Sequence, residues 1–108
     1  MATVNLDGVR ITDWNSFHAE CKREFGFPDW YGNTMDAWID CLCYLRDDEG
    51  MARFHLAEDE VLTIAIKNSA LLKQNLPDLL EELAFCIGGV NERYEDYGEK
   101  PALKLTLL

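Results

Sequence analysis

Two aspartates four residues apart, Asp36 and Asp40, are the side chains whose type and spacing offer chemistry in this sequence. The stretch 24–45 around them contains four acidic residues and no Lys or Arg, so the two carboxylates have no counter-ion nearby in the sequence. Carboxylates can transfer protons, hold a metal ion or bind basic groups of a partner. Proton transfer by a carboxylate pair needs an apolar pocket, whereas residues four apart on a helix share one face. The spacing alone fits an ordinary solvated helix face and argues against catalysis, whereas the missing counter-ion favours a pair that binds a cationic partner.

The rest of the sequence offers no recognisable catalytic or metal-binding pattern. A Gly-rich phosphate loop and a Gly-x-Ser-x-Gly turn are both missing. The two histidines and four cysteines are too scattered for a zinc site. The acidic runs 47–49 and 58–60 lack the alternating ligands of an EF-hand, and we interpret them as solvated loops. We therefore predict a protein that is not an enzyme and that binds neither a metal nor a cofactor.

A capped helix must position the two carboxylates. A loop from Pro28 to Gly32 precedes it, and the side-chain oxygen of Asn33 or Thr34 can accept a hydrogen bond from the first helical turn. Helical spacing up to about Leu45 places the carboxylates opposite an apolar face. This predicted buried face consists of Met35, Trp38, Cys41, Leu42 and Leu45. The residues beside the carboxylates are Ile39, Cys43 and Tyr44.

An earlier helix over residues 14–25 is predicted from apolar side chains at spacings of three and four residues. Asp13 is the expected N-cap, and Gly26 is the residue expected to end the helix. We interpret His18 as solvent-facing or partly packed, and we place Glu20 on the wet side. The predicted buried face consists of Trp14, Phe17, Cys21 and Phe25.

The remaining elements predict an α/β fold in a single domain that spans residues 1–108. Strands are expected at 3–6, 61–66 and 102–107, the second buried on both faces and the third at an edge. Between the last two strands we expect a short helix that ends at residue 72 and a longer one that begins near Pro77. Gly88-Gly89 should weaken or break the longer helix. Strands connected through helices imply a small parallel sheet.

The segment 46–60 receives no assignment of helix or strand. Phe54 and Leu56 are the side chains in it that we expect to cover an edge of the core.

Twenty acidic and ten basic residues give the chain a formal net charge of −10. Such a surface repels nucleic acids and anionic membranes and attracts basic proteins. The N-terminus lacks the charged and apolar regions of a signal peptide, and no apolar run in the sequence is long enough to span a membrane. We expect a cytoplasmic protein with reduced cysteines, of which Cys21, Cys41 and Cys86 lie in the core.

The stretch around the two carboxylates resembles the barstar family of intracellular ribonuclease inhibitors. The residues that carry the resemblance are Trp30-Tyr31-Gly32, Asp36-Ala37 and Asp40-Cys41-Leu42, with Phe17-His18 and residues 22–28 upstream. The resemblance covers residues 4–45 well and agrees with the remainder only in the order of elements. It implies a barstar-like α/β fold, in which a three-stranded parallel sheet packs against about four helices.

The resemblance also implies a cytoplasmic immunity or antitoxin-type protein that blocks the cationic active site of a basic, secreted ribonuclease in a 1:1 heterodimer. Such an active site collects Arg, Lys and His around a phosphodiester, and Arg pairs with a carboxylate in the geometry it uses for phosphate. Asp36 and Asp40 occupy the family's inhibitory aspartate positions, Asp40 being the deeper one, and Trp30 stands at an aromatic contact position. The expected partner-binding residues are Trp30, Tyr31, Gly32, Thr34, Met35, Asp36, Ile39, Asp40 and Cys43.

This sequence departs from the family pattern at several of these positions. Ile39 stands where the family has a tryptophan, and Thr34 replaces an asparagine. The family also contributes a glutamate from its last helix, for which Glu92, Glu95 and Asp96 are the candidates here. These departures leave an alternative open: an acidic binding module of the same fold that neutralises a different basic toxin or regulates a non-toxin protein.

Overall fold

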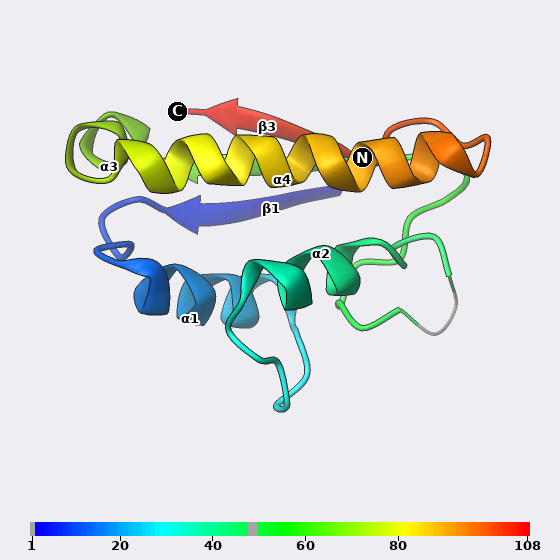
Figure 1. Ribbon diagram of the computed structural model, residues 1–108, viewed down its shortest axis with the longest axis horizontal. Helices are drawn as coiled ribbons and strands as arrows, with labels where there is room; N and C mark the ends of the chain where they lie inside the picture. Colours follow the sequence, from blue (N-terminus) through cyan, green and yellow to red (C-terminus); the bar gives the residue numbers. More distant parts are fainter. Residues whose placement is uncertain (1, 48–49) are drawn as a thin grey trace.

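The sheet consists of three parallel strands in the order β1-β2-β3. In a computed structural model, which describes residues 2–47 and 50–108, the strands are β1 at Ala2–Asp7, β2 at Leu62–Lys67 and β3 at Leu103–Leu107. Val4 pairs with Ile64 and Ile64 with Leu105, so every strand runs in the same direction (Figure 1). The predicted parallel sheet and the edge position of its last strand are confirmed.

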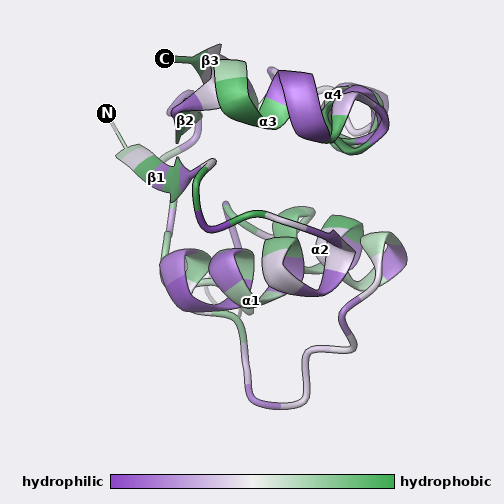
Figure 2. Cartoon of the chain, turned by 90° about the vertical axis from the view of Figure 1, so that its left-hand side faces the viewer, coloured by the Kyte–Doolittle hydropathy of each residue, from purple (hydrophilic) through white to green (hydrophobic). Residues whose placement is uncertain are grey.

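The helices pack on one side of this sheet. Those found in the described residues are α1 at Trp14–Phe25, α2 at Met35–Leu42, α3 at Ser69–Asn75 and α4 at Pro77–Asp96. α1 packs against β1, α4 against β3, and both α2 and α3 against α4. Figure 2 shows α1, α2 and α4 on the same side of the strands. On the opposite side Thr3 and Asn5 are exposed and Thr63 is half-buried, so burial of β2 on both faces holds for Ala65 and is wrong for Thr63.

α1 begins and ends where the sequence predicts. The Asp13 carboxylate accepts a hydrogen bond from the Ser16 N–H at 2.7 Å, and Gly26 closes the helix in the left-handed conformation at φ 71°. Two side chains differ from the prediction, because tertiary partners outweigh helical spacing. Glu20 is buried, accepting the Asp7 N–H at 2.9 Å and pairing with Arg23, and His18 is buried as well.

Trp14 is exposed at the start of α1, although its spacing had predicted burial. Its ring lies against Phe17 with a centroid distance of 5.6 Å, so it covers the edge of the core rather than entering it.

α4 continues through Gly88 and Gly89 without a break. The sequence left open whether residues 90–97 continue the helix or form a second piece, and the structure shows that they continue it. A buried face on both sides of the glycines holds the helix together, because packing outweighs the modest intrinsic cost of glycine. This face consists of Leu79, Leu80, Leu83, Cys86, Ile87, Val90 and Tyr94. α3 extends to Asn75, beyond the predicted end at residue 72. No described helix is long and apolar enough to cross a bilayer.

The segment between α2 and β2 covers one end of the core without forming a helix or strand in its described part. Leu56 is buried and Phe54 is partly buried, as expected. The Leu56 N–H donates to the Leu45 carbonyl at 2.7 Å, and the Arg53 N–H donates to the Phe25 carbonyl at 2.8 Å. Asp48 and Glu49 of the predicted acidic loop lie outside the described residues.

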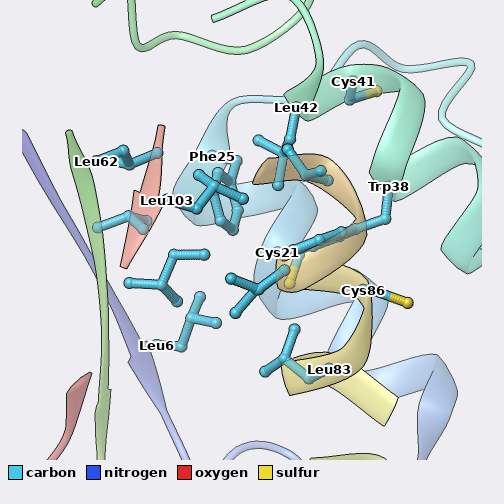
Figure 3. Close-up of a cluster of buried hydrophobic side chains, with 14 of the residues drawn as sticks. Leu6, Cys21, Phe25, Trp38, Cys41, Leu42, Leu62, Leu83, Cys86 and Leu103 are labelled. Atoms are coloured by element: carbon cyan, nitrogen blue, oxygen red, sulfur yellow. The ribbon is translucent and has the colours of Figure 1, made fainter. Parts of the chain in front are cut away.

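The hydrophobic core lies between the sheet and the helices α1, α2 and α4. Trp38 is its largest fully buried side chain. Figure 3 shows Trp38 pointing from α2 toward the sheet, into the same cluster as Phe25 and Leu42. Cys21, Cys41 and Cys86 are buried free thiols, as predicted.

Candidate functional site

α2 presents Asp36 and Asp40 on its exposed face. The Thr34 side chain caps the helix by accepting the Ala37 N–H at 3.1 Å, which selects Thr34 from the two predicted caps. On the opposite face Trp38 packs edge-on against Phe25, with ring centroids 6.2 Å apart. Burial of this face leaves the two carboxylates facing solvent.

The carboxyl end of α2 is held by Tyr94 of α4. The Tyr94 hydroxyl donates to the Leu42 carbonyl at 2.9 Å and accepts from the Leu45 N–H at 3.0 Å. Burial raises the pKa of Tyr94 to about 12, so the hydroxyl keeps its proton at neutral pH. The helix ends at Leu42, before the predicted end near Leu45, and the chain continues in a turn that remains bonded to α4.

The loop before α2 is anchored from inside the protein. Tyr31 is buried, its ring lies tilted against the Phe27 ring with centroids 4.7 Å apart, and its hydroxyl shares a hydrogen bond of 2.7 Å with His18 Nδ1. Burial lowers the pKa of His18, which favours the neutral ring. Trp30, the next residue back, is 71% exposed. The Tyr31 side chain therefore faces the interior, whereas Trp30 is exposed in the loop that precedes α2.

The other residues expected in the binding face lie in the loop before α2, on α2 itself or at its end, and they differ in exposure. Gly32 and Thr34 are exposed in the loop and at the cap. Met35, Ile39 and Cys43 are half-buried, so only part of each side chain reaches the surface. α2 thus presents two exposed carboxylates bordered by half-buried apolar side chains, and the loop before it carries an exposed indole.

An arginine from α4 pairs with Asp40. Arg93 Nη1 lies 3.6 Å from Asp40 Oδ1 and donates to Cys43 Sγ at 3.5 Å. Burial raises the pKa of the Cys43 thiol, and Arg93 partly opposes this effect. The stretch 24–45 contains no counter-ion for Asp40, and in the folded chain α4 supplies one. The signal in the sequence is that Arg93 is the single basic residue of an otherwise acidic α4.

The α4 residues beside α2 also include an acidic one that the sequence did not indicate. Burial and the Glu82 carboxylate, with a smaller effect of Asp36, raise the pKa of the Cys86 thiol to about 11. Glu82 Oε1 lies 3.7 Å from Cys86 Sγ. Glu82 therefore joins the earlier candidates for an acidic contribution from α4, which are Glu92, Glu95 and Asp96, all exposed.

A cavity of about 310 Å³ opens between the carboxyl ends of α2 and α4. Arg46 lies almost fully buried against it, over the Tyr94 ring at 5.2 Å, and donates to the carbonyls of Glu60 and Lys100 at 3.0 and 2.8 Å. The cavity is lined by Cys43, Tyr44, Arg46, Asp47, Arg93, Tyr94, Tyr97 and Glu99. Arg93 of α4 thus lines this cavity and also forms an ion pair with Asp40 of α2.

The chemistry available along α2 is recognition of cations. Asp36 and Asp40 lie in water, outside any apolar enclosure of the described residues, and carboxylates so placed are acceptors for Arg and Lys. Within the same described residues no group of three or more His, Cys, Asp or Glu side chains is arranged to hold a metal ion.

Comparison with known proteins gives one family. The sequence model of the family described as "Barstar (barnase inhibitor)" matches residues 1–106, which include the whole of α2 and α4. A search of curated proteins returned no match.

Proposed function

Because the chain belongs to the barstar family, we propose that it inhibits a basic ribonuclease by placing the carboxylates of α2 in the enzyme's cationic active site. The family implies a barnase-inhibitor-like role, and its members are inhibitors rather than enzymes. The observation that carries the proposal is the pair Asp36 and Asp40, exposed side by side on a helix whose other face is fixed by Trp38.

The carboxylates would occupy the positions of substrate phosphates. Arg binds a carboxylate through two parallel hydrogen bonds, as it binds a phosphate. Trp38 and Tyr94 hold α2 in place before any partner arrives, so association would order few additional groups, which favours affinity. The exposed Trp30 supplies an aromatic anchor, a residue type enriched at the energetic centres of interfaces.

The net charge of −10 would act at longer range. An acidic surface speeds encounter with a basic enzyme, and salt screens this attraction, an effect for which the barnase–barstar pair is itself a standard example. We place this function in a single domain, residues 1–108, acting in the cytoplasm as an immunity or antitoxin-type protein that forms a 1:1 heterodimer.

One observation supports the alternative partner. Ile39 is half-buried at the position where the family has a tryptophan. A barnase-type enzyme that binds this chain would therefore lose the aromatic contact that the family's tryptophan offers. A different basic toxin, or a regulated non-toxin protein, remains the second candidate.

Titration calorimetry with a barnase-type ribonuclease tests the proposal, using the wild-type chain, Asp40→Ala and Asp59→Ala. Asp59 is a matched control, because its side chain is 70% exposed and 3.8 Å from a lysine, against 65% and 3.6 Å from an arginine for Asp40. Truncating one partner of a buried interfacial charge pair costs about 2–5 kcal/mol, a general range that includes barnase–barstar itself and is not calculated from this structure.

We expect tight binding by the wild type and Asp59→Ala, with a loss in that range for Asp40→Ala. Equal binding by all three proteins would place the interface elsewhere. Absence of binding by the wild type would exclude barnase-type enzymes as the target and favour the alternative partner.

A further inference from the structure

Arg93 forms an ion pair with Asp40, the carboxylate on which the proposed interface depends most. It comes from α4, lies 3.6 Å from Asp40, and is 56% exposed in its side chain. It also donates a hydrogen bond to Cys43 Sγ, one turn beyond Asp40 in the sequence. A guanidinium is thus already present where a basic partner would place its own.

We propose that Arg93 is an internal competitor for Asp40, which lowers the affinity of the α2 face for cationic partners and so sets its specificity. This inference rests on the proposed function. A partner arginine or lysine can reach Asp40 in two ways. It displaces Arg93, which breaks the existing pair, or it shares the carboxylate with Arg93, which brings two like charges together away from water.

Displacement is feasible, because both members of the Asp40–Arg93 pair are more than half exposed and exposed ion pairs are weak. The neighbouring cavity gives the released guanidinium other carboxylates, since Asp47 and Glu99 line it together with Arg93. Arg93 therefore lowers the affinity of Asp40 for a cationic partner but does not prevent that partner from binding.

A purely structural role for Arg93 makes a different prediction. A cation near the carboxyl end of α4 stabilises this helix through its dipole, and the contacts of Arg93 with α2 help to hold the two helices together. In that case loss of Arg93 would lower the free energy of unfolding without tightening any complex. Affinity therefore separates the two roles.

The test measures the affinity of the full chain for a barnase-type ribonuclease, with wild type, Arg93→Gln, Arg93→Lys and Arg10→Gln compared at one salt concentration. Arg10→Gln is the matched control, because it removes the same charge from an exposed turn between β1 and α1. Arg93→Ala is a second neutral variant, and circular dichroism establishes that each protein is folded.

We expect Arg93→Gln and Arg93→Ala to bind about 2- to 5-fold more tightly than the wild type, the range that an exposed ion pair supplies. Arg93→Lys, which keeps the charge, should stay close to the wild type, and Arg10→Gln should gain less than the neutral Arg93 variants. If the wild type binds and the neutral Arg93 variants bind no more tightly than Arg10→Gln, the competitor role is overturned while the proposed function stands. If no variant binds, barnase-type enzymes are excluded as the target, and the competitor role, which rests on that interaction, fails with them.

Discussion

The hydroxyl of Tyr94 offers a sharp test of how α2 is held. Tyr94→Phe keeps the ring, and with it the packing of α4 and the contact with Arg46, but removes two hydrogen bonds to the carboxyl end of α2. Leu45 is almost fully buried, so its N–H would be left without a partner and without water. The substitution therefore isolates the link between the two helices.

The expected loss follows from the groups left unpaired. A neutral hydrogen bond contributes about 0.5–1.5 kcal/mol net, and a buried polar group without a partner costs about 1–3 kcal/mol. Tyr94→Phe leaves the Leu45 N–H without an acceptor and removes one donor from the Leu42 carbonyl. We therefore expect the free energy of unfolding to fall by about 2–4 kcal/mol, a large share of the roughly 5–15 kcal/mol by which an ordinary domain is stable.

Urea unfolding followed by tryptophan fluorescence measures this loss. Tyr97→Phe is the matched control, since Tyr97 lies at the end of the same helix and is 84% exposed, against 4% for Tyr94. Removal of its hydroxyl should change the free energy of unfolding by less than about 0.5 kcal/mol, as for most surface substitutions. Equal effects of the two substitutions, or no effect of Tyr94→Phe, would refute the assignment of these bonds as the anchor of α2.

Two further predictions concern positions far from the carboxylates. Burial lowers the pKa of His18 in the folded chain, so below about pH 6.5 the unfolded chain binds more protons than the folded chain does. The contribution of His18 to the free energy of unfolding is therefore fully present above that pH, and the free energy of unfolding should fall between pH 7 and pH 5. His18→Gln should flatten this dependence in urea unfolding, and the same substitution at the exposed His55 should leave it unchanged; a steep dependence that persists in His18→Gln would contradict the argument. Asn91→Ala should destabilise by about 2–4 kcal/mol in the same assay, because Asn91 Oδ1 accepts the N–H groups of Ala102 and Leu103 at 3.0 and 2.9 Å. Asn91→Asp should also destabilise, because it keeps the acceptor oxygen but loses the amide that donates to the Leu103 carbonyl at 3.0 Å; unchanged stability in Asn91→Ala would count against this interpretation.

Local signals predicted much of the fold and of the α2 face. The Asp13 cap and the Gly26 stop depend on a few neighbouring residues, and the structure contains both. The positions of Asp36 and Asp40 on one exposed face follow from helical spacing and the buried Trp38 opposite them. These features are set within one or two turns of chain, which is why the sequence alone predicts them.

Features that depend on distant partners were not predictable in the same way. Glu20 is buried because the Asp7 N–H donates to it, and His18 is buried because the Tyr31 hydroxyl meets it, neither partner being on the same helix. Gly88 and Gly89 remain helical because the rest of α4 packs on the core. Arg93 reaches Asp40 only after α2 and α4 come together, so no spacing within either helix indicates the pair.

The bonds from Tyr94 to α2 also set the order of events during synthesis. Tyr94 lies 52 positions after Leu42, whose carbonyl it binds, so a nascent chain carries both aspartates long before it can fix the helix that presents them. At about 5–20 residues per second, the ribosome needs roughly 3–10 s to add those residues. Any activity that depends on a fixed α2 therefore begins only after residue 94 has been added and has reached α2.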